Sequence, residues 1–130
     1  MSERRTTRRG FLVLGGVSAA ALAGVGAARL IDGGGRRRPL RAVVGEALQG
    51  ARIRAVGEAY LRERPGERGA ARLVRLLRRR PAWREALDPS DVPGVLADEA
   101  SADFRAGRTV SVGGWCLSES EARACALTAL

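Results

Sequence analysis

Acid–base chemistry has its best candidates in three carboxylates in the second half of the chain. Asp98, Glu99 and Asp103 stand at i, i+1 and i+5 of a segment with helical periodicity. Two of them could act as a general acid and a general base. The chain has no histidine, the residue that most often joins such chemistry. We therefore interpret the three carboxylates as a solvated helix face, and we predict no catalytic residue and no enzyme.

Thiol chemistry rests on two cysteines, Cys116 and Cys125. Cys116 is predicted to precede the last helix and Cys125 to lie two turns inside it, so their Cα separation should exceed the ~7 Å limit for a disulfide. An internal or an intermolecular disulfide remains an alternative to inert packing, which we favour. Two thiols without histidine make no zinc site, and a chain without lysine has no phosphate loop. The sequence predicts no cofactor and no metal.

Paired arginines near the start predict a targeting signal rather than a catalytic site. Arg8 and Arg9 are followed, after Gly10, by Phe11 and Leu12, and no charge occurs from there to residue 28. This arrangement is typical of a twin-arginine export signal, which is read by the twin-arginine translocase. We expect the chain to be exported to the periplasm or the outer face of the cytoplasmic membrane.

Small residues after the uncharged stretch predict a cleavage site between Ala27 and Ala28, although residues 21–23 also fit the rule. A retained N-terminal membrane anchor is the alternative, because the stretch is close to the ~20 residues of a membrane helix. We divide the chain into a signal peptide or anchor (1–28), a Gly/Arg-rich linker (29–39) and a small helical domain (40–130).

Charge is distributed unevenly along the chain. Residues 36–84 hold fifteen arginines against four acidic residues, a balance of +11, whereas residues 85–130 hold three arginines against eight acidic residues, a balance of −5. The two halves could neutralise each other within the fold. Alternatively, a basic face meets an anionic membrane or an acidic partner. We do not expect nucleic acid as a partner, because an exported protein rarely meets any.

Hydrophobic periodicity predicts a mainly α fold: a small bundle of three to four helices with one short extended segment. One bent helix or two short ones run from Leu40 to before Pro65. The next helix covers 67–79, and a third follows a cap at Ser90 or Asp91 and ends at Gly107. Residues 109–112 are extended. Ser118 and Glu121 then form the capping box of the last helix.

Apolar and basic residues on these elements predict their faces. We expect Trp83 and Leu87 to fill the core at a turn. The last helix has a predicted apolar face at Ala122, Cys125, Ala126, Ala129 and Leu130. The helix over 67–79 has a predicted basic face at Arg68, Arg72, Arg75, Arg78 and Arg79.

Four large apolar residues lie close together around two glycines: Val110, Val112, Trp115 and Leu117. One interpretation makes them a lid over the helical core. The other makes them a docking edge, because an extended segment ending in tryptophan suits strand addition and an aromatic hot spot.

The run from Asp103-Phe104 through Gly114-Trp115 to Cys125-Ala126-Leu127 resembles the C-terminal signature of small bacterial proteins with twin-arginine signals. The layout of signal and helical body is also similar to small subunits of membrane-bound dehydrogenases, namely gluconate 2-dehydrogenase subunit 3 and the sorbitol dehydrogenase small subunit. That resemblance implies a cofactor-free subunit that accompanies a flavoprotein through the export channel.

The sequence thus leads to two hypotheses besides a small carboxylate enzyme. In the first, the chain is an exported, non-catalytic accessory subunit or export escort of a larger envelope oxidoreductase. In the second, it is a stand-alone envelope protein whose arginine-rich face binds anionic lipid or cell-wall polymer.

Overall fold

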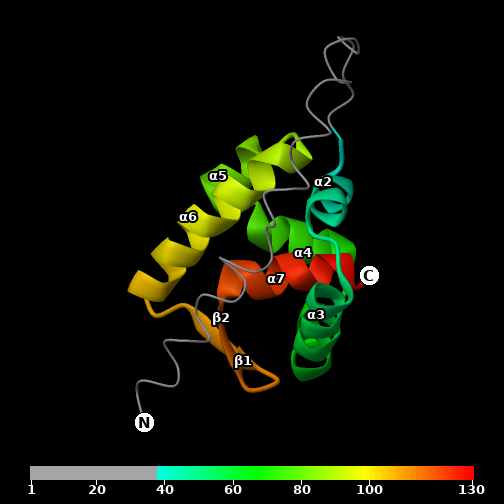
Figure 1. Ribbon diagram of the computed structural model, residues 1–130, viewed down its shortest axis with the longest axis vertical. Coiled ribbons are helices and arrows are strands. Elements are labelled where there is room, and N and C mark those ends of the chain that lie inside the picture. Colours follow the sequence, from blue (N-terminus) through cyan, green and yellow to red (C-terminus); the bar gives the residue numbers. More distant parts are fainter. Residues whose placement is uncertain (1–37) are drawn as a thin grey trace.

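The computed structural model describes residues 38–130. The predicted export signal and cleavage site lie outside these residues, and with them Arg8, Arg9, Phe11, Leu12, Ala27 and Ala28. The mainly α class is confirmed (Figure 1). Between residues 38 and 130, no helix has the length and apolarity that a bilayer crossing requires.

The described residues form more and shorter helices than the three to four predicted, and a β-hairpin replaces the single extended segment (Figure 1). In chain order the elements are α2 (Leu40–Ala47), α3 (Ala51–Glu63), the 3-10 helix η2 (Pro65–Glu67), α4 (Ala70–Leu77), α5 (Pro81–Glu85), the 3-10 helix η3 (Pro89–Asp91), α6 (Val92–Arg105), β1 (Thr109–Val112), β2 (Trp115–Ser118) and α7 (Glu119–Thr128).

Two breaks between helices have local causes. Gly50 has φ +138°, a conformation that other residues rarely adopt, and it separates α2 from α3. The alternative of two short helices is therefore the correct one. Pro81 both prevents α4 from continuing and starts α5, since its fixed φ suits the first position of a helix.

The last helix, α7, occupies the middle of the fold. Figure 1 shows it surrounded by α3, α4 and α6, and it also packs against α2 and both strands. Its buried residues surround the helix rather than form one stripe: Ser120, Glu121, Ala122, Ala124, Cys125, Ala126 and Leu127. The predicted apolar face is buried at Ala122, Cys125 and Ala126, and Ala129 and Leu130 are half-buried against the core, but burial also extends to the other sides of the helix. Alanines on several sides let the surrounding helices approach closely.

The helices α3 and α7 approach each other closely at Gly57. A Cβ atom on Gly57 would lie 2.2 Å from the carbonyl oxygen of Cys125. Because the obstacle is backbone, only glycine fits at this crossing. Both Cys125 and Gly57 are buried.

Large aromatic side chains belong to the buried core, but Leu87 does not. Tyr60 and Trp83 are 0% exposed, as expected for Trp83, whereas Leu87 is 48% exposed and the prediction that it fills the core is wrong. The cause is the turn after α5: the backbone N–H groups of Leu87 and Asp88 donate to the carboxylate of Asp91 at 3.1 and 3.0 Å. Ala86 takes the buried position instead.

Caps set the starts of η3 and α7. Asp88 and Asp91 form a capping box on η3, the short helix directly before α6, so the cap predicted for α6 stabilises η3 instead. The capping box of α7 is confirmed: the Glu121 N–H donates to Ser118 Oγ at 3.0 Å, and the Ser118 N–H donates to Glu121 Oε2 at 2.8 Å. This box fixes the direction in which α7 leaves the hairpin.

The hairpin pairs β1 with β2 antiparallel, with Val110 opposite Leu117 and Val112 opposite Trp115. Gly113 and Gly114 form the turn with positive φ angles of 54° and 78°. Such a two-residue loop matches the twist of the strands it joins. The hairpin leads directly into the buried start of α7.

Candidate functional site

The basic surface predicted from the sequence is present on and around α4. Leu73 and Leu77 of this helix are buried, so Arg72 and Arg75 project away from the core. All five predicted residues of the surface are exposed: Arg68, Arg72, Arg75, Arg78 and Arg79. We call these five residues the α4 arginine surface.

A sixth arginine extends this surface at the C-terminal end of α4. The guanidinium of Arg84 donates from Nε to the carbonyl of Arg78 at 2.7 Å and from Nη2 to the carbonyl of Arg79 at 3.1 Å. A cation at this end of a helix interacts favourably with the helix dipole. Arg84 is thereby held beside Arg78 and Arg79. No acidic residue occurs between positions 68 and 84.

Within residues 38–130, the guanidinium groups of the α4 arginine surface form no ion pair. Arg80, Arg108 and Arg123 behave differently, because each is paired with buried or half-buried carboxylates. The fold thus neutralises part of its charge internally, as one interpretation of the charge pattern predicts. It leaves the α4 arginine surface open to solvent, as the other predicts.

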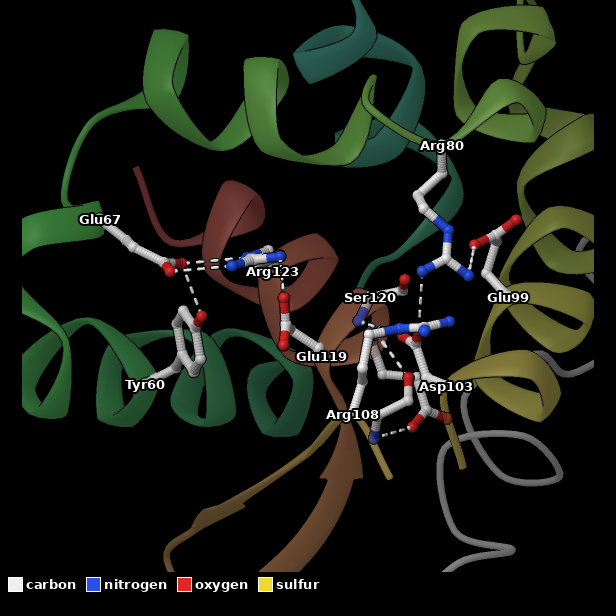
Figure 2. A network of polar contacts seen from close by, with 11 residues as sticks. Tyr60, Glu67, Arg80, Glu99, Asp103, Arg108, Glu119, Ser120 and Arg123 are labelled. Atoms are coloured by element: carbon white, nitrogen blue, oxygen red, sulfur yellow. Dashed lines mark hydrogen bonds and ion pairs between the residues drawn. The ribbon is translucent and has the colours of Figure 1, made fainter. Parts of the chain in front are cut away.

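Arg80 directly follows the basic run but turns inward (Figure 2). Its Nη2 lies 2.7 Å from Glu99 Oε2, and its Nη1 lies 3.1 Å from Asp103 Oδ1. Both carboxylates come from α6, so Arg80 ties the α4–α5 connection to that helix. This role explains why Arg80 does not belong to the exposed surface.

Asp103 is the centre of this cluster and is 1% exposed. Besides Arg80, its carboxylate accepts from Nε of Arg108 at 2.8 Å and from the N–H of Ser120 at 2.9 Å. Burial alone would raise its pKa, but the hydrogen bonds from Ser120 and Arg108, together with the charge of Arg80, lower it. Asp103 is therefore held ionised, as an anchor for the start of α7.

The interpretation of the three carboxylates as a solvated face is wrong for two of them. Asp98 is exposed, whereas Glu99 and Asp103 are buried and ion-paired. The structure does not bring Asp98 and Asp103 together as an acid–base pair. Their spacing put them on the same helix but could not reveal that Arg80 approaches from another element.

A second cluster joins α3, η2 and α7 (Figure 2). The two carboxylate oxygens of Glu67 accept from Arg123 at 3.1 and 3.0 Å, and Oε2 also accepts from the Tyr60 hydroxyl at 2.6 Å. Arg123 also pairs with Glu119, one turn before it on α7. Sequence reasoning missed this cluster, because Glu67 and Arg123 are far apart in the chain.

The environment shifts the pKa values of these groups. Burial, followed by the hydrogen bond to Glu67 and its charge, raises the pKa of Tyr60 to about 12. Burial would raise the pKa of Glu67, but the hydrogen bonds from Arg123 and Tyr60 lower it. Arg123 remains charged between these carboxylates. The cluster is thus a fixed network of charges that holds η2 and α7 together.

Glu121 differs from the other buried carboxylates because no cation faces it among the described residues. Burial raises its pKa, opposed by the hydrogen bond from Ser118 and reinforced by the charge of Asp103. Its Oε1 atom has no hydrogen-bond partner within residues 38–130. Since Glu121 is 1% exposed, its role is to cap α7 rather than to meet a ligand.

Both cysteines are free thiols. Cys125 is buried in α7, and burial raises the pKa of its thiol to about 12, so it stays protonated at neutral pH. Cys116 lies on β2 opposite Ser111 and is half-buried. Across residues 38–130, no three metal-ligating side chains of His, Cys, Asp or Glu gather in one place.

The predicted docking edge is largely part of the core. Val110, Val112 and Leu117 are 6%, 2% and 2% exposed, so a partner cannot reach them as the docking hypothesis requires. These three side chains belong to the core that surrounds α7, in agreement with the interpretation as a lid. Trp115 is half-buried and packs against the edge of the core.

Comparison of the chain with protein-family models, with curated proteins and with solved structures found no match. Its function must therefore be inferred from the arrangement of its own residues.

Proposed function

We propose that this chain is a non-catalytic domain of the cell envelope that binds an anionic partner through the α4 arginine surface. One observation carries the proposal: five arginines stay exposed and unpaired with described residues, in a domain whose half-buried arginines are all ion-paired within residues 38–130. Arginine suits such a partner, since its planar guanidinium binds phosphate or carboxylate oxygens in a bidentate manner.

The envelope location in this proposal comes from the sequence. The arginine pair Arg8-Arg9, followed by Phe11-Leu12, predicts export by the twin-arginine translocase. At the outer face of the cytoplasmic membrane, an arginine surface meets anionic lipid, cell-wall polymer or acidic protein. These are the partners from which experiment must choose.

A second candidate function is that of an accessory subunit or export escort of a larger envelope oxidoreductase, such as a dehydrogenase. In it, Trp115 is the contact residue, because it is the one member of the predicted docking edge that the core does not fully bury. A partly buried tryptophan on a hairpin is the kind of residue that anchors protein interfaces. This candidate predicts a protein partner whose binding depends on Trp115 rather than on the α4 arginine surface.

The experiment is affinity capture of the tagged full-length chain from native envelope membranes, with mass spectrometry of what co-elutes. We compare the wild type with Arg72→Glu/Arg75→Glu and with Trp115→Ala. If the proposal holds, membrane association falls at high salt and in the double arginine variant, because charge attraction drives it. The exposed variant Arg54→Glu/Arg105→Glu has the same net charge and serves as the control.

Two outcomes decide between the candidates. A single oxidoreductase in near-equal amount, lost in Trp115→Ala and kept in the double arginine variant, would replace the proposal by the accessory-subunit function. Association that resists salt and both sets of substitutions would contradict both candidates.

A further inference from the structure

The α4 arginine surface has a composition that distinguishes between partner classes. Protein interfaces have a core depleted in charge and built around apolar or aromatic anchors. Between residues 68 and 84 the large apolar side chains Leu73, Leu77 and Trp83 are buried and Val74 and Leu76 are half-buried, so none of them is exposed as such an anchor. What this segment exposes is mainly guanidinium groups.

The exposed apolar residue nearest in the chain does not supply an anchor either. Leu87 is 48% exposed, but it stands in a turn with Glu85 and Asp91, which are both exposed. An anionic partner that bound the arginines would be repelled from this acidic turn. Leu87 is therefore unsuited to enter an anionic surface beside the arginines.

The arginines also cover an area rather than line a pocket. Arg72 and Arg75 lie on the exposed side of α4, Arg68 precedes the helix, and Arg78 and Arg79 follow it. The eight residues of α4 alone span about 12 Å at the ~1.5 Å rise of a helix, and Arg68, Arg78 and Arg79 lie beyond its two ends. Several guanidinium groups spread over this length match a layer of phosphate groups better than one small anion.

We infer that the α4 arginine surface binds the headgroups of an anionic phospholipid bilayer, by charge and without insertion of an apolar side chain. The inference rests on the proposed function and names its partner. Guanidinium groups contact lipid phosphates, and Arg84, held on the carbonyls of Arg78 and Arg79, adds its charge at one end of the surface. Basic residues near an anionic leaflet each add to the attraction.

The test is co-sedimentation of the purified full-length chain with vesicles of phosphatidylcholine alone or with about 30% phosphatidylglycerol, a composition that gives an anionic surface. The measured quantity is the affinity for the anionic vesicles divided by the affinity for the neutral ones. This ratio is compared between variants that all have the same N-terminal stretch. At low salt we expect roughly a tenfold preference or more for the anionic vesicles, because each basic residue near the surface adds to the attraction. The preference should disappear in about 0.5 M salt, which screens the charges.

Matched variants locate the contact. Arg72→Glu/Arg75→Glu should abolish the preference, whereas Arg54→Glu/Arg105→Glu, with the same net charge, should keep most of it. Leu87→Gln should leave it unchanged, because no apolar side chain enters the bilayer. Circular dichroism checks that each variant is folded.

Three results would overturn the inference: no preference in the wild type, equal loss in the two double variants, or loss in Leu87→Gln. Equal competition by soluble polyphosphate at the same phosphate concentration would also overturn it, in favour of a cell-wall polymer. Failure of the inference is distinguishable from failure of the proposed function. If the vesicles show no preference while capture from membranes still depends on Arg72 and Arg75, the anionic partner is not lipid and the proposed function stands.

Discussion

The buried carboxylate of Asp103 connects four parts of the chain: its own helix α6, Arg80 before α5, Arg108 before β1 and the N–H of Ser120 at the start of α7. Removing one partner of a buried ion pair leaves the other charges uncompensated, which costs far more than the loss of an exposed pair. The stability of the domain should therefore depend on this residue.

We expect Asp103→Asn to lower the free energy of unfolding by about 3 kcal/mol, measured by urea denaturation. Asp98→Asn is the control on the same helix; its side chain is exposed, so its effect should stay within about 0.5 kcal/mol. Similar values for the two variants would show that the network does not hold the fold together.

The ionisation of Asp103 should also make the free energy of unfolding depend on pH in the acid range. Because its pKa is lower in the folded than in the unfolded chain, its contribution is present above the unfolded value of 3.8 and is lost as the pH falls through the folded pKa. Asp103→Asn should accordingly lose less stability below pH 3.8 than the wild type does. Urea denaturation of both proteins across this pH range measures the difference, and parallel losses would contradict the lowered pKa.

The pKa of Tyr60 reports on the cluster of Tyr60, Glu67 and Arg123, and it can be measured without interference because Tyr60 is the single tyrosine of the chain. Absorbance titration should show that the folded protein forms tyrosinate only near pH 12, against about 10 in the denatured chain. Glu67→Gln should lower the pKa of Tyr60 while burial keeps it above the denatured value. Exposed Glu63→Gln is the control, and a native titration near the denatured value would contradict the geometry.

At the scale of elements, the structure depends on how closely α3 approaches α7. Gly57→Ala places a Cβ atom 2.2 Å from the Cys125 carbonyl oxygen, so the helices must separate. We expect a loss of about 2 kcal/mol or more in the free energy of unfolding, comparable to overpacking a core.

Gly45→Ala is the matched control, since it lies inside α2 with nothing within 4 Å of the added Cβ. Alanine there should stabilise the protein by about 0.5–1 kcal/mol through its better helix propensity. Equal effects of the two substitutions would mean that α3 and α7 do not pack as closely as the structure places them.

Short-range sequence patterns predicted where helices begin and end better than they predicted how the helices pack together. The capping box at Ser118 and Glu121 and the break near Gly50 are short-range features, and both could be read from the sequence. The central place of α7 could not, because the alanines that surround it carry no strong periodic signal. The contact between Glu67 and Arg123 depends on tertiary packing across 56 positions.

At the scale of the molecule, the arginines have two roles: some form ion pairs inside the fold, and others form the exposed α4 arginine surface. Some arginines pair with carboxylates inside the fold, and Arg80 and Arg123 are examples that composition alone could not distinguish from their neighbours. The exposed positions of the α4 arginine surface could be predicted, because the apolar residues of the same segment mark its inner side. The sequence could not separate a lid from a docking edge, because an alternating strand looks alike whether it covers a core or binds a partner.

The most direct test of the central claim is site-specific photo-crosslinking in cells, with a diazirine amino acid at position 71. Ala71 is exposed one turn before Arg75 on α4, and exposed Ala106, at the end of α6, is the control. The proposal predicts that position 71, and not position 106, forms adducts with an anionic envelope component, which is phospholipid if the surface binds a bilayer. Equal yields at the two positions, or no adduct at position 71, would contradict the claim that the α4 arginine surface is the binding surface of this protein.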